Sequence, residues 1–408
     1  QVGRLDGRLL AGGLIALDEA RDRLLALADP RPAISLPLVE TTGLTLAEPL
    51  VSLRSQPAAD LSAMDGYAVR GADLPGPWRV IGESAAGRPF AGAIGPGEAA
   101  RISTGATVPA GADCVVVQED VARDGERLTL TGDGPAAPGA HIRRAGHDFA
   151  HGALLAEAGA VIDARLIALA AMAGHGNLSV LPRPRIAILS TGDELVPPGE
   201  ALPSPAHIPA SNGVMLASLL SALPCDLAVP PLLPDDRATI AAALDAHRQA
   251  DVIVTTGGAS VGDHDLIQPA LLDSGGTVDF WRIAMRPGKP VMVGRLGEAI
   301  VLGLPGNPVS AYVTATLLLP LVRRMLGYPS LAPIISQAIA GETFPANGLR
   351  QDFVRARWQD GRLVRLGNQD SGALLALHQA DALVVRPISA SEAEPGDPVD
   401  YIALRQGS

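Results

Sequence analysis

The segment from Asp251 to Asp265, DVIVTTGGASVGDHD, constrains the fold of this chain more than any other stretch. Residues 252–254 form an unbroken apolar run, which is typical of a strand buried on both faces within a parallel sheet. A glycine-containing loop follows, and a helical pattern begins at Leu266. Such an arrangement lets backbone N–H groups and a helix N-terminus face an anion. The carboxylates that end the loop suit magnesium, so we expect a phosphate-containing ligand with a metal here.

Composition excludes several classes of protein. The 408 residues allow more than one domain, and a 47% hydrophobic content allows a large core. The net charge of −11 argues against general nucleic-acid binding, which needs cations to neutralise phosphates. The two cysteines form no CxxC pair, and no apolar stretch approaches the ~18–20 residues that span a membrane. We therefore expect a cytoplasmic protein with no membrane or nucleic-acid partner.

The pattern of predicted strands, helices and turns changes several times along the chain, which predicts a multidomain α/β and β protein. Its centre alternates strands with helices, as βαβ units of a doubly wound sheet do, whereas short strands with Gly and Pro turns flank it. We expect four parts, which are an N-terminal helix and mixed linker domain (1–51 plus 149–184), an inserted small β domain (52–148), an α/β domain (185–328) and a C-terminal β-barrel (329–408).

Polar loops follow the predicted strands of the α/β domain. In an open α/β sheet, ligands bind beyond the carboxyl ends of the strands. A single acidic residue in such a loop is more often a solvated side chain or a helix cap. Several such loops at one sheet edge favour a binding site, and its candidate residues are Thr191, Gly192, Asp193, Glu194, Asp235, Gly257, Gly258, Ser260, Gly262, Asp265, Pro305 and Asn307.

The glycine loop has a competing interpretation. Residues 258–262 match G-x-S-x-G, the nucleophile elbow of α/β hydrolases, and they follow a strand. That mechanism needs an acid and then a histidine after Ser260, but the only histidine beyond His264 is His378, in the predicted tail domain. The doubled glycine and the neighbouring carboxylates suit a phosphate cradle better. The chain has neither the G-K-[ST] of a Walker loop nor a GxGxxG at a strand exit.

Three cations gather after a later strand. Arg282, Arg286 and Lys289 surround a Pro-Gly turn, and Lys289 is the single lysine among 32 basic residues. In a chain of negative net charge this cluster favours an anion site over a solvated basic turn.

Several long motifs together resemble one family, the molybdopterin molybdenumtransferases, which are related to the C-terminal domain of gephyrin. The matching segments are SAMDGYAVR, RISTGATVPAGAD, IRRAGHD, LSTGDEL, TTGGASVGDHD, FWRIAMRPGKP and LPGNPVSA. They run in order from about residue 57 to 313. The resemblance implies molybdenum insertion, in which adenylyl-molybdopterin and molybdate give molybdenum cofactor and AMP with Mg²⁺.

The resemblance also assigns residues. It implies catalytic roles for Asp65, Thr104, Arg143, Asp148 and Lys289, and magnesium or adenylate binding for Glu194, Asp235 and Asp265. It implies binding of molybdate, as a substrate, by Arg286, Lys289, Ser310, Arg350 and Ser371. In this family the first β domain faces the α/β domain of the other subunit, so the resemblance implies a homodimer with composite active sites.

This chain has arginine at positions 282 and 286, where the family often has lysine. Positive charge is retained, but arginine does not give up its proton. Two alternatives stay open, a pterin adenylyltransferase relative that shares only the α/β domain and a gephyrin-like scaffold that acts through its dimer.

Overall fold

A computed structural model describes residues 14–28, 31–257, 266–288, 291–331 and 333–404. The chain forms two compact units, each of which is described here by itself. The main unit comprises residues 1–34, 43–45 and 180–408, and the second unit comprises residues 35–42 and 46–179. None of the helices in the described ranges has the length and hydrophobicity needed to span a membrane.

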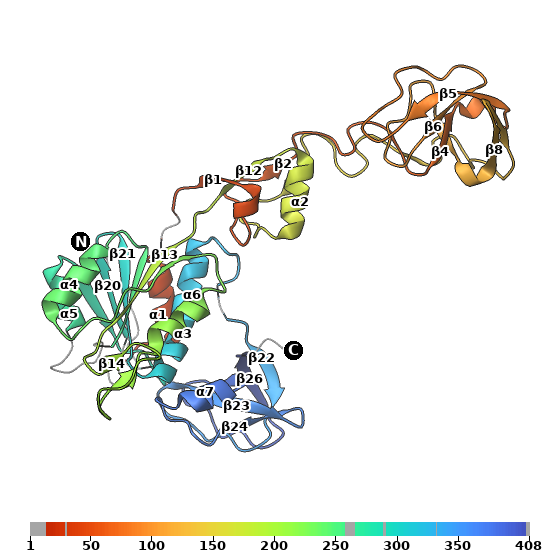
Figure 1. Cartoon of the computed structure of the whole chain (residues 1–408). Coiled ribbons are helices and arrows are strands. Elements are labelled where there is room, and N and C mark those ends of the chain that lie inside the picture. Colours follow the sequence, from red (N-terminus) through yellow and green to blue (C-terminus); the bar gives the residue numbers. More distant parts are fainter. Residues whose placement is uncertain (1–13, 29–30, 258–265, 289–290, 332, 405–408) are drawn as a thin grey trace. The chain divides into compact units, whose positions relative to one another are not determined.

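The second unit is built mostly of short strands (Figure 1). Its larger sheet has the order β7-β4-β6-β5-β9-β8, with bounds Cys114–Val117, Gly66–Val69, Glu98–Ile102, Trp78–Ser84, Arg127–Leu130 and Val121–Asp124. Three two-stranded sheets pair β1 with β12 (Ile34–Pro37, Asn177–Val180), β2 with β11 (Leu50–Val51, Leu154–Ala156) and β3 with β10 (Leu61–Ser62, Ile142–Arg143). Helix α2 (Ala164–Ala173) is capped by Asp163, and 3₁₀ turns lie at Leu38–Glu40, Gly71–Asp73 and Gln118–Asp120.

The main unit contains a sheet with the order β16-β13-β17-β21-β20-β18. Its strands span Asp226–Ala228, Arg185–Ser190, Val252–Thr256, Ala299–Leu304, Val291–Leu296 and Thr277–Trp281. The first four are mutually parallel, as the apolar run at 252–254 predicted, and every residue of β17 is buried. Strand β20 runs antiparallel to both of its neighbours. It is joined to β21 by a tight turn instead of a crossover helix, so the chain reverses direction between them.

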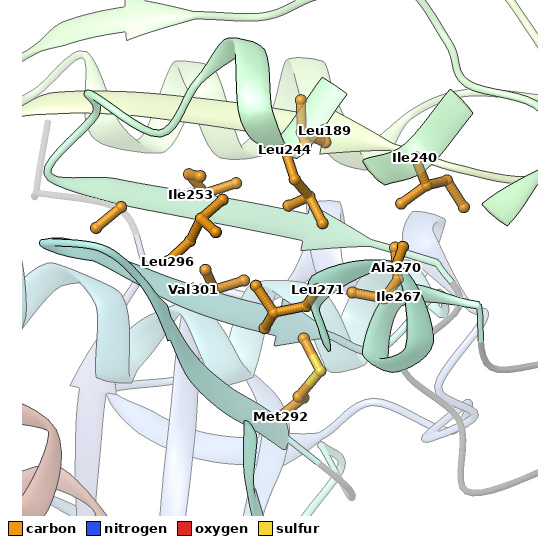
Figure 2. Packing of buried hydrophobic residues seen from close by; sticks show 11 residues of the cluster. Leu189, Ile240, Leu244, Ile253, Ile267, Ala270, Leu271, Met292, Leu296 and Val301 are labelled. Carbon is orange, nitrogen blue, oxygen red and sulfur yellow. The ribbon is translucent and has the colours of Figure 1, made fainter. Parts of the chain in front are cut away.

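Helices cover both faces of this sheet (Figure 1). Helices α4 (Arg237–Ala246) and α5 (Ile267–Asp273) lie on one side, and α1 (Leu17–Leu25), α3 (Asn212–Leu220) and α6 (Pro308–Met325) on the other. Figure 2 shows Leu244 and Leu271 of the first pair packed over Ile253 and Val301 of the sheet. Burying these aliphatic side chains supplies the main driving force for folding in a chain with 3% aromatic residues.

A second sheet in the main unit has the order β19-β23-β25-β26-β22, and β24 pairs with β23. Its strands span Met285–Arg286, Gln351–Gln359, Ala382–Arg386, Pro398–Ala403, Ser336–Ile339 and Arg362–Arg365. A single bridge between Ala340 and Leu363 links the two edges of this sheet. Strand β18 of the main sheet ends at Trp281, and β19, which follows it in the chain, joins the C-terminal sheet instead.

Two smaller elements complete the main unit. The short parallel pair of β14 (Leu195–Val196) and β15 (Ile208–Pro209) follows the loop after β13. Helix α7 (Leu374–Gln379) lies in the tail, where only strands were expected. It is a single short amphipathic stretch, with Ala376 and Leu377 buried and Leu375 exposed, and so gives little periodic signal.

Candidate functional site

The carboxyl ends of the parallel strands β13, β17 and β21 meet at one edge of the main sheet. The Thr191 N–H donates to the Thr256 carbonyl oxygen at 3.1 Å, which joins the first two loops. Gly257 has φ +94°, and a Cβ there would lie 2.2 Å from the Thr191 carbonyl oxygen. Only glycine meets both requirements, so this residue allows the two loops to approach each other closely.

Two acidic loops are connected at this edge, which we call the acidic edge (Thr191–Glu194 with Asp235). The Asp235 N–H donates to Asp193 Oδ1 at 3.0 Å, and the Asp193 N–H donates to Asp235 Oδ2 at 3.4 Å. A Cβ at Gly192 would lie 2.5 Å from Glu194 Oε2. Each aspartate therefore holds the backbone of the other loop.

The metal set expected from the sequence falls only partly within the described residues. Glu194 and Asp235 are described, and Asp265 lies outside. Within the described ranges, no group of three or more His, Cys, Asp or Glu side chains could hold a metal ion. Gly258, Ser260, Gly262 and Lys289 also lie outside the described residues, so the glycine loop and the single lysine stay predictions.

The N-terminus of α6 is bonded to the loop that carries Ser371 on one side and to helix α3 on the other. Asn307 precedes this helix, and its Nδ2 donates to Ser371 Oγ at 3.1 Å. The Val309 N–H donates to the Ser371 carbonyl oxygen, also at 3.1 Å. Ser310 is buried in the first turn of the helix. On the other side, Asn212 Nδ2 donates to the Gly306 carbonyl oxygen at 2.7 Å.

A cavity of about 380 Å³ opens beside this connection, and we call it the arginine cavity. Its lining includes both positively and negatively charged side chains, namely Arg286, Arg365, Arg386, Asp352 and Asp370. Ser371, expected from the sequence to bind molybdate, lines the same cavity. Sequence reasoning named Arg286 and Ser371 but missed the other four, because they come from three strands and a loop and match no motif.

Asp352 is the buried carboxylate of this cavity. It forms an ion pair with Arg286 Nη2, and it is 5% exposed. Burial raises the pKa of Asp352, and the nearby Arg286, Arg350 and Arg386 guanidinium groups oppose that rise. Arg350 precedes β23 and is not a lining residue of the cavity.

Arg282 lies between β18 and β19, and its side chain is exposed. Its carbonyl oxygen accepts a hydrogen bond from the Ile15 N–H at 2.9 Å. Pro305 opens the loop after β21.

The second unit brings two expected residues together. Asp65 Oδ1 accepts hydrogen bonds from the Thr104 N–H at 2.6 Å and from the Thr104 hydroxyl at 3.0 Å. The Thr104 N–H, and then its hydroxyl, hold the pKa of Asp65 below its usual range. Arg143 lies on β10 and Asp148 follows that strand, both exposed. These four residues belong to the second unit, and the acidic edge belongs to the main unit.

Three family models match successive parts of this chain. Residues 15–174 match the MoeA N-terminal region, domains I and II. Residues 187–324 match a probable molybdopterin binding domain, and residues 337–404 match the MoeA C-terminal region, domain IV.

Individual relatives agree with these matches. The chain is 40% identical to a molybdopterin molybdenumtransferase from Haemophilus influenzae, over 77% of this chain and 78% of that protein. It is 36% identical to molybdopterin molybdenumtransferase 2 from Mycobacterium tuberculosis, over 89% and 93%. A crystal structure of the molybdopterin biosynthesis MoeA protein from Pyrococcus horikoshii aligns with a TM-score of 0.82 and 29% identity, over 97% of this chain and 100% of that chain.

Proposed function

Because this chain belongs to the MoeA family of molybdopterin molybdenumtransferases, we propose that it inserts molybdenum into molybdopterin. Adenylyl-molybdopterin and molybdate are the substrates, and molybdenum cofactor and AMP are the products. Water cleaves the phosphoanhydride of the adenylylated pterin in this reaction, so that AMP leaves and the pterin keeps its own phosphate. Both substrates are anions, so the enzyme must bring like charges together.

The position of Ser371 is the single observation that carries this proposal. Ser371 lines the arginine cavity, and it also accepts a hydrogen bond from Asn307, which follows β21 at the carboxyl-end edge of the main sheet. We propose that the oxyanion in the cavity and the nucleotide at the sheet edge bind on either side of this Asn307–Ser371 contact. This proximity is what a transfer between the two substrates requires.

The acidic edge is proposed to hold the adenylyl-molybdopterin. Loops at the carboxyl ends of parallel strands are where α/β sheets bind ligands. The close approach of Gly257 to Thr191 leaves a narrow backbone surface there. The residues assigned to this substrate are Thr191, Gly192, Asp193, Glu194, Gly257, Gly258, Ser260, Gly262, Arg282, Pro305 and Asn307.

Magnesium is proposed to bind at the same edge. Carboxylate oxygens are the ligands that Mg²⁺ prefers, and Glu194 and Asp235 supply them, with Asp265 as the third candidate. Asp235 can still contribute to such an ion, because its Oδ2 accepts only a long hydrogen bond of 3.4 Å from the Asp193 N–H. When bound, the ion would neutralise phosphate charge and make the anhydride easier to break.

Molybdate is proposed to bind in the arginine cavity. A guanidinium group is always charged and presents a planar set of donors that match oxyanions. Arg286 and Ser371 line this cavity, and Arg350 acts electrostatically on Asp352 within it. The residues assigned to molybdate are Arg286, Lys289, Ser310, Arg350 and Ser371.

The second unit is proposed to complete the active site of another copy of the chain, in a homodimer. Asp65, Thr104, Arg143 and Asp148 would then act on the substrate held by the partner's main unit. We further propose the four parts 1–51 plus 149–184, 52–148, 185–328 (doubly wound) and 329–408 (a β-barrel), and a cytoplasmic location.

Mixing two inactive variants tests the composite site. Asp65→Asn disables the second unit, and Glu194→Gln disables the main unit. In a homodimer with shared sites, random mixing leaves about one quarter of the sites free of both changes, so activity returns. Mixed variants that stay inactive, or a monomer by light scattering, would contradict the dimer.

AMP release tests the function itself. The protein is incubated with adenylyl-molybdopterin, molybdate and magnesium, and AMP is measured by chromatography. We expect AMP release that depends on molybdate and molybdenum that remains with the pterin. AMP at the background level of a Glu194→Gln control would refute the proposed activity.

A further inference from the structure

Three charged residues form a row across neighbouring strands at one end of the C-terminal sheet. Asp352 on β23 is paired in register with Arg286 on β19 and with Arg386 on β25. Side chains of paired residues point to the same face of a sheet. All three side chains line the arginine cavity.

Arg386 is the buried member of this row. It is 8% exposed, and one of its Nη atoms donates to the Ser391 carbonyl oxygen. Its Nε–H is buried and has no acceptor among the described residues. A buried donor without a partner is rare in proteins and calls for an explanation. An oxyanion in the cavity would supply a hydrogen-bond acceptor for the Arg386 guanidinium group.

Arg286 is the exposed member. Its side chain is 61% exposed, and the ion pair with the buried Asp352 carboxylate ties it to the cavity. A free arginine at such a position would sample many rotamers and would lose that freedom on binding a ligand. The pairing with Asp352 uses Nη2, and among the described residues no acceptor is recorded for the other guanidinium donors of Arg286.

We propose that Arg386 is a further oxyanion-binding residue of the arginine cavity and that Asp352 is a positioning residue, which holds Arg286 in place beside it. This inference rests on the proposed function for the identity of the oxyanion, molybdate. Asp352 does not contact the anion, because two negative groups repel each other. Its charge fixes the orientation of Arg286 and offsets part of the repulsion between the two guanidinium groups.

A purely structural role for the row is the competing explanation. The face that carries Asp352 continues into the apolar core of the C-terminal sheet, through Val354 and Ala356. An ion-pair row could simply close that core against solvent. The two explanations differ in what a substitution changes, since a structural role affects stability and leaves selective molybdate binding unaltered.

Direct molybdate binding by calorimetry tests the proposal, with wild-type protein, Arg386→Gln and Asp352→Asn. We expect the Kd for molybdate to rise about tenfold or more in Arg386→Gln and about three- to tenfold in Asp352→Asn. In turnover, KM for molybdate should rise with it, while KM for adenylyl-molybdopterin should change less than about twofold. Asp352→Glu keeps the charge and should restore much of the affinity.

Two control variants lie on the same sheet. Arg357→Gln changes an arginine of β23 that is exposed and does not line the cavity. Asp400→Asn changes an aspartate of β26 that accepts a hydrogen bond from Gln337 Nε2. Both should bind molybdate as the wild type does. If Arg386→Gln fails to fold, Arg386→Lys keeps the charge but lacks the Nε–H, and the same rise in Kd is expected.

Unchanged molybdate affinity in the folded Arg386 and Asp352 variants would overturn the proposal. It would equally be overturned if wild-type protein bound no molybdate at millimolar concentration. Molybdate binding that depends on this row, in a protein that releases no AMP, would support the inference and refute the proposed enzymatic function. The two ideas can therefore fail separately.

Discussion

The acidic edge and the arginine cavity lie in one unit but are built in different ways. The acidic edge consists of loops that directly follow strands, and its geometry depends on glycine and on backbone N–H groups that donate to carboxylates, as Asp193 and Asp235 do to each other. The arginine cavity depends on strand register, which sets Arg286 beside Asp352. Short motifs thus produce the negative site, whereas long-range pairing produces the positive one.

The largest effect is expected at the acidic edge, for Gly257→Ala. The new Cβ would lie 2.2 Å from the Thr191 carbonyl oxygen, and the residue would keep φ near +94°, so the two loops must separate. We expect the free energy of unfolding to fall by about 2–4 kcal/mol and turnover to fall at least about a hundredfold. Thermal unfolding and the AMP assay measure both.

Gly199→Ala is the matched control for this substitution. Gly199 has φ +92°, but no atom lies within 4 Å of its Cβ position. The free energy of unfolding should fall only by the strain of the left-handed backbone, about 1 kcal/mol. Equal losses in the two variants would mean that the contact with Thr191 does not shape the edge.

A smaller effect, confined to magnesium, is expected for Asp235→Asn. The amide oxygen can still accept the hydrogen bond from the Asp193 N–H, so the loops should stay joined, but the charge is lost. We expect the magnesium concentration for half-maximal turnover to rise about tenfold, with stability changed by less than about 0.5 kcal/mol. Titration of AMP release with magnesium measures it.

The neighbouring Asp236 provides the control for Asp235. Its side chain caps helix α4 through the Thr239 N–H at 2.7 Å. Asparagine caps a helix about as well as aspartate does, so Asp236→Asn should leave both stability and magnesium dependence nearly unchanged. A magnesium dependence that shifts equally in both variants would remove Asp235 from the proposed metal site.

The connection between the two regions should be less sensitive. Ser371→Ala removes the acceptor for Asn307 Nδ2 but keeps the backbone hydrogen bond to Val309. We expect a loss of about 0.5–1.5 kcal/mol in stability and a KM for molybdate raised a few fold. Ser336→Ala on β22, outside the cavity, serves as the control. If the KM for molybdate of Ser371→Ala equals that of Ser336→Ala, Ser371 does not belong to the oxyanion site.

The smallest expected effect is a change in the pKa of one carboxylate, Asp65. The pKa values of Asp65 and Asp352 depart from the usual aspartate value in opposite directions. Burial raises the pKa of Asp352, whereas the Thr104 backbone N–H and hydroxyl lower the pKa of the exposed Asp65. Thr104→Val removes the hydroxyl and keeps the N–H, so the pKa of Asp65 should rise part of the way back toward its usual range. Carbon-detected NMR titration of the side-chain carboxyl measures this.

The sign of the stability effect follows from that direction. A carboxylate with a lowered pKa in the folded protein stabilises it above the usual aspartate pKa, and this contribution is lost as pH falls through the lowered value. In Thr104→Val the loss should begin at a higher pH than in the wild type. As a control, Thr129→Val on β9 should leave the pKa of Asp65 unchanged. If the pKa of Asp65 also stays unchanged in Thr104→Val, the Thr104 hydroxyl does not contribute to lowering it.

The sequence alone was enough to predict the alternation of strands and helices in the main unit and the polar loops after β13 and β21. These features are local, because an apolar run followed by glycine and acidic residues is contiguous in the chain. It was also enough to identify Asp65 and Thr104, which form a hydrogen-bonded pair in the structure. Their motifs carried the resemblance to the family.

Tertiary structure alone decided the rest. The antiparallel course of β20, the departure of β19 to the C-terminal sheet and the row of Arg286, Asp352 and Arg386 have no signature along the chain. The three residues of that row are separated by dozens of positions, and they meet only because three strands pair in one register. Pairing register depends on which faces are buried against the core, and a linear pattern does not contain that information.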